Sequence, residues 1–255
     1  MSAASRPPYA AMVLAAGLGT RMQPFTADTA KPLLSVAGRT LLDYALDRLG
    51  EAGIARAVVN AHWHAEQVAD RVRARAAREA GRMELVLQPE EELLGTGGAV
   101  VKALEAGALP KTEPFLMVNG DSLWLDGPIP AIQRLRQRFD PAELDVLLLV
   151  ARAATVIGEV GAGDFAMDEN GALRRRGENE IVPYVFAGVQ MVSPGLFADA
   201  PSDPFSMNLI WDKAIETGRI AAIVHDGPWF HLSRPSDITD TERAIRDPLY
   251  GPSNT

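Results

Sequence analysis

The chain has 255 residues, of which 47% are hydrophobic and 23% are charged, the balance of an ordinary soluble globular protein. It has no cysteine, which excludes thiol catalysis, disulfide bonds and cysteine–zinc sites and is consistent with a reducing, cytoplasmic location. Its formal net charge of −8 gives no overall attraction to nucleic acid or to an anionic membrane, so any positive charge used for binding must be local.

The first predicted element is a buried strand, Ala10–Ala16, inside the apolar run Tyr9–Leu18. A single arginine precedes this run, so it also has the character of a signal-peptide core. We favour the strand, because a glycine-containing turn follows it directly. No apolar run in the chain approaches the about 18 residues that a membrane-spanning helix needs.

The turn after this strand combines glycines with two cations. Gly17 and Gly19 permit positive φ angles and leave backbone N–H groups free to point at phosphate oxygens, while Arg21 and Lys31 supply positive charge. A dinucleotide-binding fingerprint would need a third glycine, and a P-loop would need a Gly-Lys-Ser/Thr sequence; the turn has neither. The segment therefore predicts a site for a nucleoside triphosphate.

The segment from Leu14 to Leu33 resembles the opening motif of the sugar-1-phosphate nucleotidylyltransferases, LAAGxGTRMxPxT followed by PKPL. Ala30 stands where the family usually has proline, and the resemblance extends over about residues 9–246. It implies transfer of a nucleotidyl group from a nucleoside triphosphate to a sugar 1-phosphate, with release of pyrophosphate. The nucleotide-binding residues of this segment are then Leu14, Ala15, Ala16, Gly17, Gly19, Thr20 and Arg21.

Up to about residue 150 the chain alternates strand-like runs with helical patterns, which is typical of βαβ units around a mainly parallel sheet. A capping-box variant at Thr40 opens a helix that ends near Gly50. Further strands are expected over Ala57–Asn60, Met83–Gln88, Phe115–Asn119 and Asp145–Ala151, and further helices over Ala65–Ala80 and Gly98–Ala106. We therefore predict an α/β fold with a Rossmann-like, mixed and mainly parallel sheet flanked by helices; the resemblance implies its GT-A-like nucleotidyltransferase form.

In such sheets ligands lie at the carboxyl ends of the strands, where four segments converge: Gly17–Arg21, His62–His64, Gln88–Thr96 and Asn119–Asp121. A glutamine amide can pair with a donor and an acceptor on a pyrimidine edge, and the resemblance implies that Gln88 contacts the base. Gly95 and Thr96 belong to the loop that the family places beside it. His62 and His64 are interpreted as rim or packing residues.

The Asn119-Gly120-Asp121 turn follows an apolar strand and offers a carboxylate that can hold Mg²⁺, which takes oxygen ligands and bridges substrate phosphates. The resemblance implies that Asp121 binds the metal and Asn119 the sugar. Because a phosphate monoester, with a second pKa of about 6, is mostly ionised at neutral pH, the reaction needs no general base. We assign Arg21 to the leaving pyrophosphate and Lys31 to the α-phosphate and the attacking phosphate.

After about residue 151 closely spaced glycines predict hairpins rather than crossovers. Later elements are expected as strands over Tyr184–Val192, Ile220–His225 and Pro228–Leu232 and as helices over Met207–Gly218 and Pro235–Arg246. We expect a single domain, 1–255, with a nucleotide-binding half (9–150), a sugar-phosphate-binding half (151–246) that includes a small β-hairpin region, and a tail (247–255). Two arginine-rich runs, Arg71–Arg78 and Arg174–Arg176, are interpreted as solvated faces.

Gly163-Asp164-Phe165 and Phe186-Ala187-Gly188 resemble motifs of the uridylyltransferases that act on N-acetylmuramate 1-phosphate. This subgroup implies UTP as the nucleotide, cell-wall sugar recycling as the pathway, and sugar contacts at Asp164 and Gly188. A guanylyltransferase that uses mannose 1-phosphate is the alternative enzyme. Either reading implies small-molecule substrates, no nucleic acid or membrane partner, and a monomer or small homo-oligomer.

One motif departs from the family. Where a second metal-binding aspartate is usual, in W-x-D-[VI]-G-[TS], this chain has His231, followed by Ser233 and Arg234. A neutral imidazole can ligate a metal, but Mg²⁺ prefers oxygen, so His231 is expected to bind a softer ion such as Mn²⁺ or to hydrogen-bond the sugar phosphate. The departure also leaves open a nucleotide-binding regulator with weak or no turnover.

Overall fold

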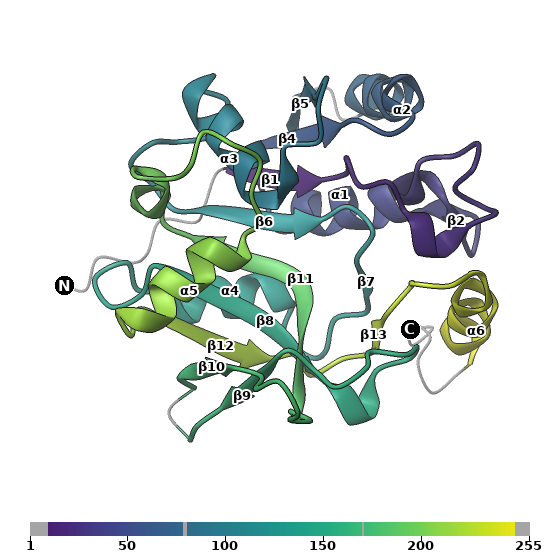
Figure 1. Cartoon of the computed structure of the whole chain (residues 1–255). Coiled ribbons are helices and arrows are strands. Elements are labelled where there is room, and N and C mark those ends of the chain that lie inside the picture. Colours follow the sequence, from purple (N-terminus) through teal and green to yellow (C-terminus); the bar gives the residue numbers. More distant parts are fainter. Residues whose placement is uncertain (1–9, 79–80, 170, 248–255) are drawn as a thin grey trace.

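The computed structural model describes residues 10–78, 81–169 and 171–247. Its centre is a nine-stranded mixed sheet in which the consecutive strands β5-β4-β1-β6 are parallel, followed by the antiparallel strand β11 (Figure 1). From β11 the sheet continues to the hairpin β9–β10 and, separately, to β8, which pairs in parallel with β12. The expected mixed, mainly parallel sheet and the hairpin region are therefore confirmed.

The nine strands are β1 (Ala10–Leu14), β4 (Arg56–Ala61), β5 (Glu84–Pro89), β6 (Phe115–Asn119), β8 (Val146–Arg152), β9 (Phe165–Met167), β10 (Leu173–Arg175), β11 (Tyr184–Val192) and β12 (Ile220–Val224). Two short ribbons lie outside this sheet: β2–β3 (Ser35–Val36 and Arg39–Thr40) and β7–β13 (Leu123–Trp124 and Trp229–Phe230). The helices are α1 (Leu41–Glu51), α2 (Ala65–Arg78), α3 (Gly95–Glu105), α4 (Ala131–Arg138), α5 (Asn208–Glu216) and α6 (Pro235–Arg246).

Successive residues of each strand face opposite sides of the sheet, so each side has its own core. Val13 of β1 packs in one core with residues of α1, α2 and α4, whereas Met12 packs in the other with residues of α3 and α5. Both side chains are completely buried. Helix α6 lies apart from the sheet and closes a third, smaller core with the β2–β3 and β7–β13 ribbons (Figure 1).

Several helices and strands begin or end at other residues than predicted. The first strand ends at Leu14 instead of Ala16, because the chain turns away to form the glycine loop, and α3 begins at Gly95, so the predicted Gly95–Gly97 loop is the first turn of a helix. Helix α4 and the β2–β3 ribbon were not predicted. Residues 79–80 of the second predicted helix and 248–255 of the predicted tail lie outside the described residues.

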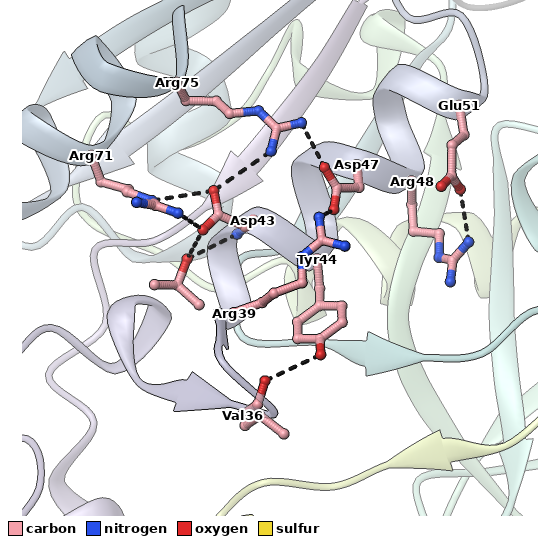
Figure 2. A network of polar contacts seen from close by, with 10 residues as sticks. Val36, Arg39, Asp43, Tyr44, Asp47, Arg48, Glu51, Arg71 and Arg75 are labelled. Carbon is pink, nitrogen blue, oxygen red and sulfur yellow. Dashed lines mark hydrogen bonds and ion pairs between the residues drawn. The ribbon is translucent and has the colours of Figure 1, made fainter. Parts of the chain in front are cut away.

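The arginines of α2 are a further correction. Arg71 and Arg75 do not form a solvated face but contact Asp43 and Asp47 of α1, and Arg39 also pairs with Asp47 (Figure 2). These five residues are called the α1–α2 ion-pair cluster below. Arg73, by contrast, is on the exposed side of the helix and pairs with Asp70 and Glu66, as the sequence prediction has it.

Helix α1 begins where the sequence predicts, at a threonine cap. The Thr40 hydroxyl accepts the Asp43 backbone N–H at 3.2 Å and donates to the Asp43 carboxylate at 2.6 Å. Burial raises the pKa of Asp43, but hydrogen bonds from Arg71 and Thr40 and the charges of Arg71 and Arg75 lower it more, so the pKa lies below its usual value. These contacts hold α1 against α2, and both helices pack on the same side of β1.

Candidate active site

A cavity of about 360 Å³ lies at the carboxyl ends of the parallel strands β1, β4, β5 and β6. Such a position is where open α/β sheets bind ligands. Of the residues predicted for the site, those that line it are Leu14, Ala16, Gly17, Gly19, Thr20, Arg21, Lys31, Gly95, Thr96, Asn119 and Asp121. Three of the four predicted segments thus meet at one cavity, and it is lined in addition by Met22, Pro32, Asn60, Glu90, Leu93 and Ser233.

The glycine loop forms one wall. Gly19 has a left-handed conformation with φ of 63°, and a Cβ added there would lie 3.0 Å from side-chain atoms of Lys31 and Thr26. Glycine is thus required both for the turn and for the close approach of Lys31. The Thr26 hydroxyl donates to the Gly19 carbonyl at 2.8 Å, which closes the loop, and the turn Thr20–Met22 then carries Arg21 to the cavity.

Lys31 and Asp121 both line the cavity and form an ion pair. The Lys31 Nζ lies 2.5 Å from Asp121 Oδ2, and the two side chains are 14% and 32% exposed. Lys31 begins a single helical turn, Lys31–Leu33, and Asp121 follows the end of β6. Because both side chains are partly exposed at the cavity, an incoming anion such as a phosphate can replace Asp121 as the partner of Lys31.

The Asn119–Asp121 turn is packed tightly against β1. The Gly120 N–H donates to the Leu14 carbonyl at 2.8 Å, and a Cβ at Gly120 would lie 3.0 Å from that oxygen. On the other side Gly188, with φ of 79°, leaves room for the neighbouring Ser122 hydroxyl, which a Cβ there would strike. Gly188 does not line the cavity but supports the turn that does, and its predicted sugar contact stays a prediction.

The far end of the cavity is formed by the start of α3. Gly95 has φ of 72°, and a Cβ there would lie 2.4 Å from the Phe205 carbonyl oxygen. The Thr96 hydroxyl accepts the Met207 N–H at 2.8 Å, so the loop before α5 holds this helix end in place. Gly95 and Thr96 therefore present backbone rather than side-chain groups to the cavity.

Gln88 lies beneath the start of α3. It is 6% exposed, does not line the cavity, and its amide donates to the Ala99 carbonyl of α3 at 3.0 Å. Its predicted contact with the base stays a prediction. Ala15 likewise is buried and contributes its backbone N–H, which donates to Asn60 Oδ1 at 2.7 Å.

Asn60 and Glu90 are site residues that the sequence analysis missed. Asn60 belongs to the end of β4, and Glu90 directly follows β5; their side chains meet at 2.7 Å between Asn60 Nδ2 and Glu90 Oε1. Both are buried, at 3% and 5% exposure, and both line the cavity. The rule that predicted Asn119 and Asp121, a polar residue at the carboxyl end of an apolar strand, would have found them.

His231 does not line the cavity, although it is electrostatically coupled to it. Burial lowers the pKa of His231, and the positive charges of Lys31 and Arg21 lower it further, whereas Asp121 and Asp237 act in the opposite direction. These effects favour the neutral form of the imidazole. Its neighbour Ser233 does reach the cavity, because Asp237 Oδ2 accepts the Ser233 and Arg234 backbone N–H groups at 2.8 and 2.7 Å.

The described residues contain no group of three or more histidine, cysteine, aspartate or glutamate side chains that could enclose a metal ion. Mg²⁺, however, is commonly held by one or two carboxylates together with substrate phosphates and water. Asp121, whose carboxylate lines the cavity, fits that arrangement. The residues present therefore suit a magnesium ion shared with a substrate, not a closed protein cage.

Asp164 and the histidines after β4 lie outside the cavity lining. Asp164 accepts the Phe186 N–H at 2.8 Å and so joins β9 to β11, and its predicted sugar contact stays a prediction. His62 Nδ1 lies 3.0 Å from the Glu90 carbonyl and His64 Nε2 lies 3.0 Å from the Ala27 carbonyl. Both histidines are packing residues around the site, as interpreted from the sequence.

Residues 11–186 match the family model described as the MobA-like NTP transferase domain. The chain is 37% identical, over 91% of its length and 94% of the relative, to the N-acetylmuramate α-1-phosphate uridylyltransferase of Caulobacter vibrioides. It is 24% identical, over 89% of its length and 60% of the relative, to the catalytic subunit beta of mannose-1-phosphate guanylyltransferase from Drosophila melanogaster.

The fold has a counterpart among solved structures. HddC from Yersinia pseudotuberculosis, complexed with GMP-PN, superposes with a TM-score of 0.72 at 20% identity, over 93% of this chain and 100% of that one. This supports the predicted GT-A-like nucleotidyltransferase form of the fold. None of the helices in the described part of the chain combines the length and apolarity needed to cross a bilayer.

Proposed function

This chain belongs to the MobA-like NTP transferase family and, within it, to the sugar-1-phosphate nucleotidyltransferases, and from that membership we propose that it transfers the uridylyl group of UTP to N-acetylmuramate 1-phosphate. The observation that carries the proposal is that Arg21, Lys31 and Asp121 surround one cavity in a chain 37% identical to an enzyme named for that reaction. The pathway would be recycling of cell-wall sugars.

The reaction forms a bond between an oxygen of the sugar phosphate and the α-phosphorus of UTP, and it breaks the bond from that phosphorus to the bridging oxygen of pyrophosphate. The attacking phosphate is already mostly ionised at neutral pH, since its second pKa is about 6. Catalysis therefore consists of positioning and of neutralising negative charge. The cavity supplies both through a rigid loop and two cations.

We assign Arg21 to the leaving pyrophosphate and Lys31 to the α-phosphate and the attacking phosphate. Lys31 now pairs with Asp121 at 2.5 Å, so binding of the triphosphate draws its ammonium group from the carboxylate to phosphate oxygens. Gly17 and Gly19 let the backbone of the loop approach the phosphates closely. We assign Asn119, which lines the cavity on the same turn as Asp121, to the sugar ring.

We propose Mg²⁺ as the cofactor, with Mn²⁺ as a substitute. When bound, the ion would neutralise phosphate charge, and Asp121 would hold it together with substrate oxygens. His231 stays a predicted second metal ligand or hydrogen-bonding partner of the sugar phosphate. The assignment of residues 9–150 to the nucleotide and 151–246 to the sugar phosphate, the cytoplasmic location and the monomeric or small homo-oligomeric state also remain predictions.

A mannose-1-phosphate guanylyltransferase is the second candidate, supported by the relative in Drosophila melanogaster. The lower identity of 24%, against 37% for the uridylyltransferase, makes it the more distant possibility. The departure at His231 motivates a third candidate, a nucleotide-binding regulator without turnover. The cavity, with Arg21, Lys31 and Asp121 all facing it, argues for turnover.

The test is pyrophosphate release by the purified protein with each of UTP, GTP, dTTP, CTP and ATP, against N-acetylmuramate 1-phosphate and mannose 1-phosphate, with Mg²⁺ or Mn²⁺. We expect release with UTP and N-acetylmuramate 1-phosphate, abolished by a chelator. Release with GTP and mannose 1-phosphate alone would establish the second candidate. Nucleotide binding without release from any pair would favour the regulator.

A further inference from the structure

We infer that three side chains at the N-terminal end of α2 set the positions of the two cations assigned to the phosphates. The three are Trp63, His64 and Gln67, called the loop brace below. They hold the backbone that joins Arg21 to Lys31. The inference rests on the proposed function, because it takes both cations to act on one nucleotide. It makes the three side chains positioning residues, which act through the backbone and do not contact a substrate.

The backbone between the two cations has few anchors of its own. Arg21 and Lys31 each lie in a single helical turn, and residues 23–30 between these turns are called the link. The structure describes the whole link, which contains no helix or strand and buries only Thr26 and Ala30. With so little packing, the path of the link depends on hydrogen bonds to its neighbours.

Two aromatic side chains hold the middle of the link. The Trp63 indole N–H donates to the Thr26 carbonyl at 3.0 Å. His64 Nε2 lies 3.0 Å from the Ala27 carbonyl, which can only accept, so this nitrogen carries a hydrogen and donates it. The two rings also meet edge to face, with centroids 4.6 Å apart, so each limits the movement of the other. Two consecutive carbonyls of the link are thus fixed by one pair of packed rings.

Gln67 pairs with the link through both ends of its amide. Its Nε2 donates to the Asp28 carbonyl at 2.8 Å, and its Oε1 accepts the Ala30 N–H at 3.3 Å. A residue of a neighbouring parallel strand pairs in the same way, with a carbonyl and with the N–H two residues further on. Glutamate would lack the donor for this pairing. Because Ala30 directly precedes Lys31, the amide fixes the point at which the turn that carries the lysine begins.

The backbone at His64 is strained in a way that serves this contact. Its φ of 49° is left-handed, a conformation that residues other than glycine rarely adopt. The His64 carbonyl accepts the Gln67 and Val68 N–H groups at 3.0 and 3.3 Å, so the strained residue also starts the hydrogen bonding of α2. Such strain persists where surrounding contacts impose it, and it is common at functional sites. Here it accompanies the contact of the His64 ring with the link.

The loop brace is attached to the central sheet. It directly follows β4, which pairs with β1 on one side and with β5 on the other. Asn60, near the end of β4, accepts the Ala15 N–H at 2.7 Å and so holds the start of the glycine loop. The end of β4 thus holds the glycine loop through Asn60 and the link through the loop brace.

The positions of the two cations matter because the reaction leaves little other chemistry for the protein to perform. Arg21 is assigned to the leaving pyrophosphate and Lys31 to the α-phosphate, so both must lie where negative charge develops. A displacement of about 1 Å in such a group costs about a hundredfold in rate. A mobile link still lets the cations reach the phosphates of bound UTP, so loss of the loop brace lowers kcat more than it raises KM.

The first experiment removes single donors from the loop brace. Trp63→Phe keeps an aromatic ring but lacks the N–H, and Gln67→Glu keeps the length but lacks the donor to Asp28. We expect each to lower kcat for pyrophosphate release about fivefold or more, as for loss of one hydrogen bond, with KM for UTP within about twofold of wild type. Glu66→Gln, an exposed neighbour on α2, is the matched control and should keep the wild-type kcat.

A merely structural role gives a different result. It would lower the free energy of unfolding in urea and leave kcat, per folded molecule, within about twofold of wild type. That outcome in both variants would overturn the inference. Hydrogen exchange of the link is a further measurement that needs no reaction: we expect faster exchange over residues 23–30 in both variants and no change in Glu66→Gln.

The second experiment tests whether Gln67 acts through Lys31. The Gln67 amide holds Ala30, the residue before Lys31. In a Lys31→Met background, Gln67→Glu should therefore lower kcat by less than about twofold, since no ammonium group is left to position. Equal effects of Gln67→Glu in the wild-type and the Lys31→Met backgrounds would overturn the positioning role.

The two proposals can fail separately. If no nucleotide and sugar phosphate release pyrophosphate but both variants speed hydrogen exchange in the link, the proposed reaction is wrong and the loop brace stands. If pyrophosphate is released with kcat and exchange unchanged in both variants, the reaction stands and the loop brace is wrong.

Discussion

Two sites in this protein pair a carboxylate with a cation, but the two carboxylates differ in how many partners they have. In the α1–α2 ion-pair cluster, Asp43 is 3% exposed at its side chain, and Arg71, Arg75 and Thr40 all contact it (Figure 2). At the cavity, Asp121 is 32% exposed and pairs with Lys31 alone among the side chains that are described. One carboxylate has its partners permanently, and the other has room for a ligand.

The difference shows what marks a site. A short distance between opposite charges is common to both clusters, so it identifies neither as functional. The cavity adds a left-handed glycine at residue 19 and a volume of about 360 Å³. It also adds two backbone N–H groups at the start of α3, those of Gly95 and Thr96, that have no acceptor within the described part of the chain. Those features have no use in a purely structural ion pair, and they fit a bound polyanion.

The largest expected effect separates catalysis from stability. Lys31→Met should lower kcat by about a hundredfold or more, the scale of losing one charge-stabilising group in an active site. Its free energy of unfolding should change little, because the pair with Asp121 is partly solvated. Steady-state pyrophosphate release and urea unfolding of the same preparation measure both; a loss of kcat under threefold would contradict the role of Lys31.

The converse substitution lies in the structural cluster. Asp43→Asn removes the charge that compensates Arg71 and Arg75 and should lower the free energy of unfolding by about 2 kcal/mol. In the protein that remains folded, kcat should stay within about twofold of wild type, since a distant structural site acts on chemistry only through folding. Urea titration gives the first quantity, and initial rates well below the unfolding midpoint give the second. A large fall of kcat without loss of stability would erase the distinction between the clusters.

Acid should weaken the same cluster. The pKa of Asp43 is lowered in the folded protein, so its contribution to stability is complete above the unfolded value, near 3.8, and is lost as the pH falls through the folded one. The stability difference between wild type and Asp43→Asn should therefore shrink below about pH 4. Unfolding curves at a series of pH values test this, and a difference that grows on acidification would reverse the assigned sign.

The smallest effect is expected on the outer side of α2. Arg73 pairs with Asp70 and Glu66, but its side chain is 61% exposed. Because exposed ion pairs contribute little, Arg73→Ala should leave the unfolding midpoint and kcat unchanged within error. Arg73→Ala is the matched control for the alanine substitution of Arg71 or Arg75. A clear loss of stability in Arg73→Ala would show that the exposed side of α2 also contributes to folding.

The sequence predicted the α/β class, the order of most elements and the meeting of Arg21, Lys31 and Asp121 at one cavity, because these depend on local patterns. Glycines beside a strand and a polar turn after an apolar strand are visible in any single stretch of chain. The Asn60–Glu90 pair joins two segments 30 residues apart, and only the parallel pairing of β4 with β5 brings them together.

Gln88 and Glu90 illustrate the same limit. Gln88 and Glu90 point to the same side of β5, but they differ by two residues, or about 6 to 7 Å along the strand. That shift places Gln88 beneath α3 and Glu90 in the cavity. Helix α3 begins at Gly95, three residues earlier than the predicted Gly98. The start of this helix determines which residues at the end of β5 lie beneath it and which reach the cavity, and local sequence fixes helix boundaries poorly.

The most direct test of the account is a crystal structure of the protein with Mg²⁺ and a non-hydrolysable UTP analogue. The account predicts triphosphate oxygens against Arg21 and the glycine loop, and Lys31 moved from Asp121 to the phosphates. A nucleotide bound elsewhere, or bound in this cavity with its phosphates away from Arg21 and with the Lys31–Asp121 pair intact, would contradict it.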